Sequence, residues 1–197
     1  MALKKRVEFN MFVGHFALGV ATKKLAQTMP IWILFLAPQF MDLLFAPLVA
    51  IGIESFEPGA YGHLTLNILY THSLVGALAI AAVAYWIGNG FWKSSRGGII
   101  LASLSFSHWI VDVMVHRPDM PILPGNLGNF PLLGFGLWDF EYGVFATEVL
   151  MAIIAVFLYF RWALKEKQGA RWFVGPTIII LIFAVLIISE FRNMPAL

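Results

Sequence analysis

Three ionisable residues follow one another at four-residue intervals within an apolar stretch of the sequence: His108, Asp112 and His116. A helix places residues four apart on the same face, so these side chains would lie one above another. A histidine and an aspartate one turn apart can bind the same metal ion. Imidazole together with carboxylate favours Zn, Mn or Fe over Ca, which prefers oxygen ligands. The spacing therefore predicts part of a transition-metal site.

Other apolar stretches also carry ionisable residues, although each charge buried in a bilayer costs about 2.5–3.5 kcal/mol unless it is compensated. Counted from one end of each stretch, they fall in one layer about 6–15 Å below the membrane boundary. The residues in this layer are His15, Asp42, His72, His108, Asp112 and Glu148. The common depth predicts one centre that holds one or two divalent transition-metal ions, with zinc as the expected metal. Its predicted ligands are His15, Asp42, His72, His108 and Asp112.

Further residues are assigned supporting roles. Glu148 is either another metal ligand or the general base that takes a proton from water. Glu148 and the ligand Asp112 are the predicted catalytic residues. His116 either joins the ligands or only ends the helix, because Pro118 disfavours helix at the residue before it. Ser73 and Ser107 are each adjacent to a histidine and are expected to donate hydrogen bonds to it. Glu190, at a helix end, is expected to extend to the membrane surface.

Long apolar helices must position these residues. Hydrophobic residues make up 60% of the 197 residues and charged residues only 12%, whereas soluble domains are about 25% charged. The sequence therefore predicts an all-α integral membrane protein, a single domain over 1–197 with about six transmembrane helices in one bundle. The predicted segments are 9–28, 31–52, 64–92, 98–116, 141–160 and 172–190. Residues 117–140, rich in proline and glycine, are predicted to form an ordered extracytoplasmic loop.

Lysine and arginine predict the orientation of the bundle. If all six segments cross the membrane, most basic residues fall on one side, which the positive-inside rule assigns to the cytoplasm. They are Lys23, Lys24, Lys93, Arg96, Arg161, Lys165, Lys167 and Arg171. The basic residues at 3–6 oppose this orientation for the first segment. If that segment lay flat on the cytoplasmic surface, His15 would be about 15–25 Å from Asp112 and could not share its site.

The order of these motifs resembles a bacterial family. The stretches "GHFALGVATKK", "LFLAPQFMDLLF", "THSL", "SHWIVDVMVHRPDMP" and "GLW" are similar to YdjM-like membrane-bound metal-dependent hydrolases over roughly residues 10–160. The ligand order His, Asp, His, H-x-x-x-D also resembles zinc-dependent phospholipase C and P1-type nucleases. That likeness matches His15, Asp42, His72, His108 and Asp112 to ligand positions.

The sequence departs from both patterns. The YdjM-like P-D-x-D motif is absent, since Pro38 is followed by Gln39 and the next acid is Asp42. The downstream H-x-x-x-E of the phospholipases has no counterpart, and only Glu148 is available. One or two metal ions are therefore expected rather than three.

The predicted function is hydrolysis of a phosphoester, such as a lipid headgroup, by a multi-pass protein of the bacterial inner membrane. Its expected partner is membrane lipid. Nucleic acid is not expected, because the net charge is only +2. One alternative is a proton or metal-ion transporter, which needs the same intramembrane residues but also polar steps through the other half of the membrane. Another is a non-catalytic protein whose buried polar network only fixes helix packing.

Overall fold

The fold is an all-α bundle with one small two-stranded sheet, as seen in a computed structural model that describes residues 13–57, 65–166, 172–192 and 194. The helices are α1 (Val13–Ala21), α2 (Ile31–Leu36), α3 (Phe40–Ala50), α4 (Leu74–Trp92), α5 (Ser95–Val115), α6 (Glu141–Glu166) and α7 (Val174–Phe191). Short 3-10 helices are η1 (Thr22–Lys24), η2 (Ala37–Gln39), η3 (Pro124–Asn126) and η4 (Leu137–Asp139). The strands β1 (Ser55–Glu57) and β2 (Thr65–Asn67) pair antiparallel.

Five spans within the described residues are long and apolar enough to cross a membrane. They are Ile31–Ala50, Leu74–Trp92, Ser95–Val115, Glu141–Glu166 and Val174–Phe191. This confirms the predicted helical membrane protein. The predicted segment 64–92 begins later as a helix, because Thr65–Asn67 pair with β1 and Ser73 caps α4 at Leu74.

The first predicted segment differs most from its prediction. Helix α1 ends at Ala21 instead of residue 28, and its nine residues rise only about 14 Å. The chain turns there because the buried Lys23 donates hydrogen bonds to the carbonyl oxygens of Gln27 and Met29, at 2.7 and 2.6 Å. Residues 1–12, with the basic cluster at 3–6, lie outside the described part of the chain.

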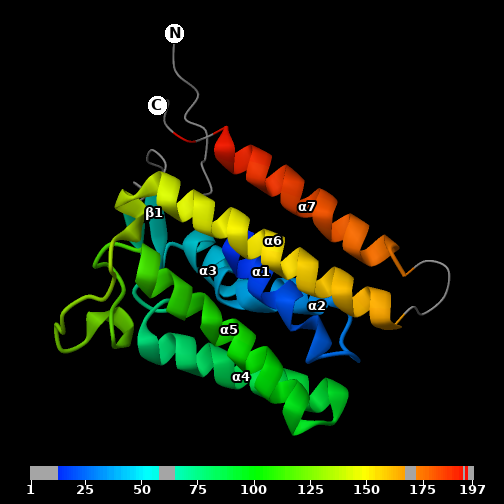
Figure 1. The fold of residues 1–197 in the computed structure, drawn as a ribbon. Helices are drawn as coiled ribbons and strands as arrows, with labels where there is room; N and C mark the ends of the chain where they lie inside the picture. Colours follow the sequence, from blue (N-terminus) through cyan, green and yellow to red (C-terminus); the bar gives the residue numbers. More distant parts are fainter. Residues whose placement is uncertain (1–12, 58–64, 167–171, 193, 195–197) are drawn as a thin grey trace.

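The helices form layers around α1. Figure 1 shows α1, α2 and α3 between α6 and α7 on one side and α4 and α5 on the other. One apolar core joins α1 to α6 and α7, and a second joins α2 to α4 and α5. Helices α1 and α2 pack with their backbones in contact, since a Cβ at Gly19 would overlap the Leu34 carbonyl. This close packing keeps α1 and its His15 in the centre of the bundle.

The span Ile31–Ala50 is broken in the middle. Pro38 lies in the 3-10 turn η2 between α2 and α3, and proline lacks the N–H that a continuous helix needs. The break starts α3 at Phe40 and puts Asp42 in its first turn. The break therefore makes Asp42 a first-turn residue of α3 within the span.

The connection after α5 is irregular, as predicted for residues 117–140. It contains η3, η4 and an isolated β-bridge between Met120 and Leu133. Backbone hydrogen bonds from Leu74 and Val75 to the carbonyls of Pro121 and Ile122 attach it to the start of α4. The loop therefore packs over the end of the bundle where α4 begins, two residues after His72.

Candidate metal centre

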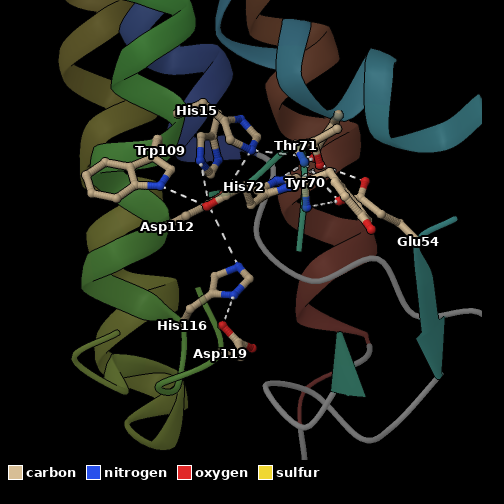
Figure 2. Close-up of polar contacts among 11 residues, drawn as sticks. His15, Glu54, Tyr70, Thr71, His72, Trp109, Asp112, His116 and Asp119 are labelled. Carbon is tan, nitrogen blue, oxygen red and sulfur yellow. Dashed lines mark hydrogen bonds and ion pairs between the residues drawn. The ribbon is translucent and has the colours of Figure 1, made fainter. Parts of the chain in front are cut away.

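Asp112 lies at the centre of a buried cluster that includes four of the five histidines in the chain; the fifth, His63, lies outside the described residues. Its Oδ2 is 3.0 Å from His108 Nε2 and 3.5 Å from His72 Nε2. Its Oδ1 is 3.2 Å from His15 Nε2 and 3.9 Å from His116 Nε2. Each histidine thus presents the same ring nitrogen to one carboxylate (Figure 2).

Asp42 supplies the second carboxylate of the cluster. Its Oδ1 lies 3.4 Å from His72 Nε2 and 3.5 Å from His108 Nε2. The Asp42 side chain is 27% exposed, against 6% for Asp112. The cluster therefore opens to its surroundings beside Asp42.

Two groups in this cluster could hold a metal ion. His15, His108 and Asp112 form one, and Asp42, His72 and His108 form the other, each with one ligand atom per residue and all of these within 4.8 Å of one another. His108 belongs to both groups. The predicted set of five ligands is thus brought together. It fits one ion, or two adjacent ions of which only one binds His108, because His108 Nε2 has a single lone pair.

The hydrogen bonding also fits a bound cation. Both ring nitrogens of His15 and Nδ1 of His108 are buried without a hydrogen-bond partner among the described residues. Buried polar atoms are rarely left in this state, because losing water without a replacement costs free energy. A metal ion at the centre would satisfy the inward-facing nitrogen of His15. Imidazole and carboxylate are ligands that Zn, Mn and Fe accept.

The orientation of His72 is fixed by a short hydrogen-bonded chain that ends at Glu54 (Figure 2). The Thr71 hydroxyl donates to Glu54 Oε2 at 2.8 Å, so its oxygen accepts from His72 Nδ1–H, also at 2.8 Å. Glu54 is itself held by the backbone N–H groups of Tyr70 and Thr71, at 2.8 and 2.9 Å. With Nδ1 protonated, the lone pair of His72 is on Nε2 and faces the cluster.

His116 has a comparable arrangement. Its Nδ1–H donates to Asp119 Oδ1 at 3.0 Å, which turns Nε2 toward Asp112, and its ring lies 4.1 Å from the ring of Trp138. Helix α5 ends at Val115, and His116 itself has extended backbone. His116 thus both ends the helix and lies beside the cluster.

The structure corrects the expected partners of the histidines. Ser73 Oγ donates to the Tyr70 carbonyl and accepts from Gly76 N–H, which makes it the cap of α4. Ser107 Oγ donates to the carbonyl of Leu104 in its own helix. Sequence adjacency does not bring either hydroxyl to a ring nitrogen, because successive side chains point in different directions. Instead, His72 Nδ1–H donates to Thr71 and His116 Nδ1–H donates to Asp119, and His108 Nδ1 has no hydrogen-bond partner among the described residues. The sequence signal for Asp119 was its place three residues after His116.

Glu148 lies in the predicted layer but belongs to neither candidate group. Its Oε1 accepts the backbone N–H of Gly14 at 3.1 Å, next to His15 in the chain. The carboxyl group of Glu190 lies beside it. Glu190 is 5% exposed, so the expectation that it extends to the membrane surface is wrong. The buried pair joins α6 and α7 at the depth of the cluster.

The short distance between His15 and Asp112 decides how the first segment can lie. A segment flat on the opposite surface would hold these residues far apart, whereas the structure places their side chains 3.2 Å apart. Lys23, at the other end of α1 and η1, lies 4.7 Å over the Trp162 ring near the end of α6. The first segment therefore runs beside α6 through the bundle. The side of the membrane on which the N-terminus lies stays a prediction.

Comparison of the chain with models of protein families, with curated proteins and with solved structures gives no match. The resemblance to YdjM-like hydrolases therefore stays a prediction.

Proposed function

We propose that the chain is a membrane-embedded metal-dependent hydrolase that acts on a phosphoester, with a lipid headgroup as its substrate and zinc as its metal. The observation that carries the proposal is that four histidine Nε2 atoms and two carboxylates meet in one cluster. The cluster is buried except beside Asp42, whose side chain is partly exposed. A metal ion bound there would activate water and polarise a phosphoryl oxygen. By the family resemblance, we propose the bacterial inner membrane as its location.

The residues of the chain have separate roles in this proposal. Asp112 provides the negative charge that four histidines share, and His72 and His116 are oriented by their outer hydrogen bonds. Asp42 lies where a substrate reaches the centre. Glu148, held by Gly14 N–H and outside both ligand groups, is the candidate base that accepts a proton from water.

The missing hydrogen bond at the His15 ring favours a metal centre over a network that only fixes helix packing. A packing network stabilises helices through the hydrogen bonds that it completes. His15 Nε2 lies 3.2 Å from Asp112 Oδ1 but makes no hydrogen bond to a described residue, and a metal ion at the centre would bind this nitrogen. The distribution of acids favours hydrolysis over transport. Within the described spans, the half of the bundle away from the cluster contains no histidine, and its one acid is Glu166 at the end of α6.

The deciding experiment measures metal and turnover on the same purified protein. Elemental analysis should find Zn, and the protein should hydrolyse bis-p-nitrophenyl phosphate and phospholipid until a chelator removes the metal. A near-zero content of Zn, Mn, Fe and Co would contradict a metal centre and favour the packing network. Metal-dependent ion flux in liposomes without phosphoester turnover would favour the transporter.

The substitution Glu148→Gln tests the proposed base. It should leave the metal content unchanged, because Glu148 belongs to neither ligand group, and it should abolish hydrolysis. Glu166→Gln, at the far end of the same helix, is the matched control and should keep both. If Glu148→Gln loses its metal together with activity, Glu148 is a ligand and not the base.

A further inference from the structure

An apolar groove of about 190 Å³ lies between the broken span of α2 and α3 and the pair α4 and α5. Every residue that lines it is apolar. Ala84 and Leu101 are buried and form its floor, whereas Trp32, Leu36 and Leu43 are 61, 41 and 55% exposed and form its rim. The groove is therefore open to the medium around the bundle.

One end of the groove lies beside the candidate metal centre. The lining residues Phe40 and Leu43 flank Asp42 in the first turn of α3. On α5, Leu101 precedes His108 by seven residues, which is a rise of about 10 Å. Asp42 is also the more exposed of the two cluster carboxylates. The groove thus reaches the level of Asp42 on α3 and extends along the spans away from the cluster.

We propose that this groove binds an acyl chain of a phospholipid whose phosphate group lies at Asp42, beside the metal centre. The groove faces the bilayer along three membrane spans, where hydrocarbon chains are the surrounding medium. Its apolar lining offers no hydrogen bond to a polar ligand, which would lose its bonds to water there. A groove of this small volume fits a single chain, whereas a helix of another protein needs a broader face.

A phospholipid has one part that suits the apolar groove and another that suits the metal centre. An acyl chain and a phosphate belong to the same molecule and are joined through a short linker, as the groove and the cluster opening are adjacent in the protein. The identification of this lipid as the substrate rests on the proposed function. The binding of an acyl chain in the groove does not require turnover and is tested separately.

The experiment uses the full-length protein in phosphatidylcholine nanodiscs doped with a phosphatidylcholine that carries a diazirine at the middle of one acyl chain. After irradiation, peptide mass spectrometry locates the adducts. We expect them to concentrate on the α2–α3 span that contains Trp32, Leu36 and Leu43. Adducts spread evenly over all exposed spans would overturn the proposal, and so would crosslinks in which a second protein chain covers the groove.

Two matched variants make the result specific. Ile87→Trp adds bulk at a lining position that is 39% exposed, and Ile153→Trp adds the same bulk on α6, at a 60% exposed position outside the groove. Ile87→Trp should lose the groove adducts and keep its metal content, whereas Ile153→Trp should keep both. Groove adducts that persist in Ile87→Trp would overturn the proposal.

Failure of the proposed function would look different. Suppose that the wild-type protein lacks metal or leaves bis-p-nitrophenyl phosphate intact, but still forms groove adducts that disappear in Ile87→Trp. This result would reject the hydrolase and support the acyl-chain site. Metal and turnover without groove adducts would support the hydrolase and reject this lipid site.

Discussion

The histidines of the cluster divide into two pairs by what holds their outer ring nitrogen. His72 and His116 each have Nδ1 bonded to a partner from an irregular connection, Thr71 backed by Glu54 in one case and Asp119 in the other. His15 and His108 have no partner at Nδ1 among the described residues, and their rings lie 4.2 Å apart in the helical interior. We call these the rim pair and the inner pair.

The presence or absence of a partner at Nδ1 reflects how each pair of histidines is positioned. The inner pair depends on the packing of α1 against its neighbours, where the backbone contact at Gly19 leaves little freedom. The rim pair lies at helix ends, His72 just before α4 and His116 just after α5, where backbone alone does not fix a ring. Hydrogen bonds from the connections supply the missing constraint. The loops are thus part of the site.

The largest effect is expected from Asp112, which both pairs share. Asp112→Asn removes the one charge that all four histidines face and should lower metal affinity by more than about 100-fold, beyond the 10–100-fold typical of outer hydrogen-bond partners. Elemental analysis of the purified variant measures this. Asp139→Asn is the control, because this exposed carboxylate pairs with Arg117 in the loop and such exposed pairs contribute little. A variant at Asp112 that keeps wild-type metal content would refute the shared centre.

A smaller effect should separate the members of the inner pair. His108 belongs to both candidate metal groups and His15 to one. His108→Ala should therefore weaken metal binding more than His15→Ala, which keeps the group of Asp42, His72 and His108 and should retain metal with reduced stoichiometry or affinity. Titration with Zn under matched conditions compares the two variants. Equal losses would show that the two groups act as one site for a single ion.

The sequence predicts the residues that face the centre better than the partners that orient them. A common depth identifies His15, Asp42 and His72, and four-residue spacing links His108 to Asp112, because helix geometry converts sequence spacing directly into side-chain direction. Glu54 and Thr71 were missed because their contact depends on how a connection folds back, and sequence distance does not encode that fold. The same limit explains why Ser73, next to His72 in sequence, was wrongly expected to bond it and instead caps α4.

The next effect concerns Thr71, the hydrogen-bond partner of His72 in the rim pair. Thr71→Val removes the acceptor for His72 Nδ1–H while keeping the shape of the side chain, and metal affinity should fall about 10–100-fold. Thr71→Ser keeps the hydroxyl and should restore most of the affinity. Competition with a chromogenic chelator gives the affinities, and nitrogen NMR of His72 reports which ring nitrogen holds the proton.

Thr147→Val is the control for Thr71, because the Thr147 hydroxyl donates to the Gly143 carbonyl in its own helix. Its metal affinity should equal that of the wild type. If Thr71→Val binds metal as tightly as Thr147→Val, helix packing alone positions His72, and the distinction between rim and inner pairs fails.

The smallest effect is expected at Asp119, the other rim partner. Asp119→Asn weakens the bond that orients His116, but two features limit the consequence. The Asp119 side chain is 23% exposed, so water screens its charge, whereas Glu54 is 1% exposed. His116 Nε2 is also the most distant of the four histidine nitrogens from Asp112, at 3.9 Å. We expect a loss of metal affinity of about tenfold or less, at the low end for such partners, measured by the same chelator competition. A loss as complete as that of Asp112→Asn would place His116 among the metal ligands. An affinity equal to that of Asp139→Asn would mean that the ring of Trp138 alone holds His116 in place.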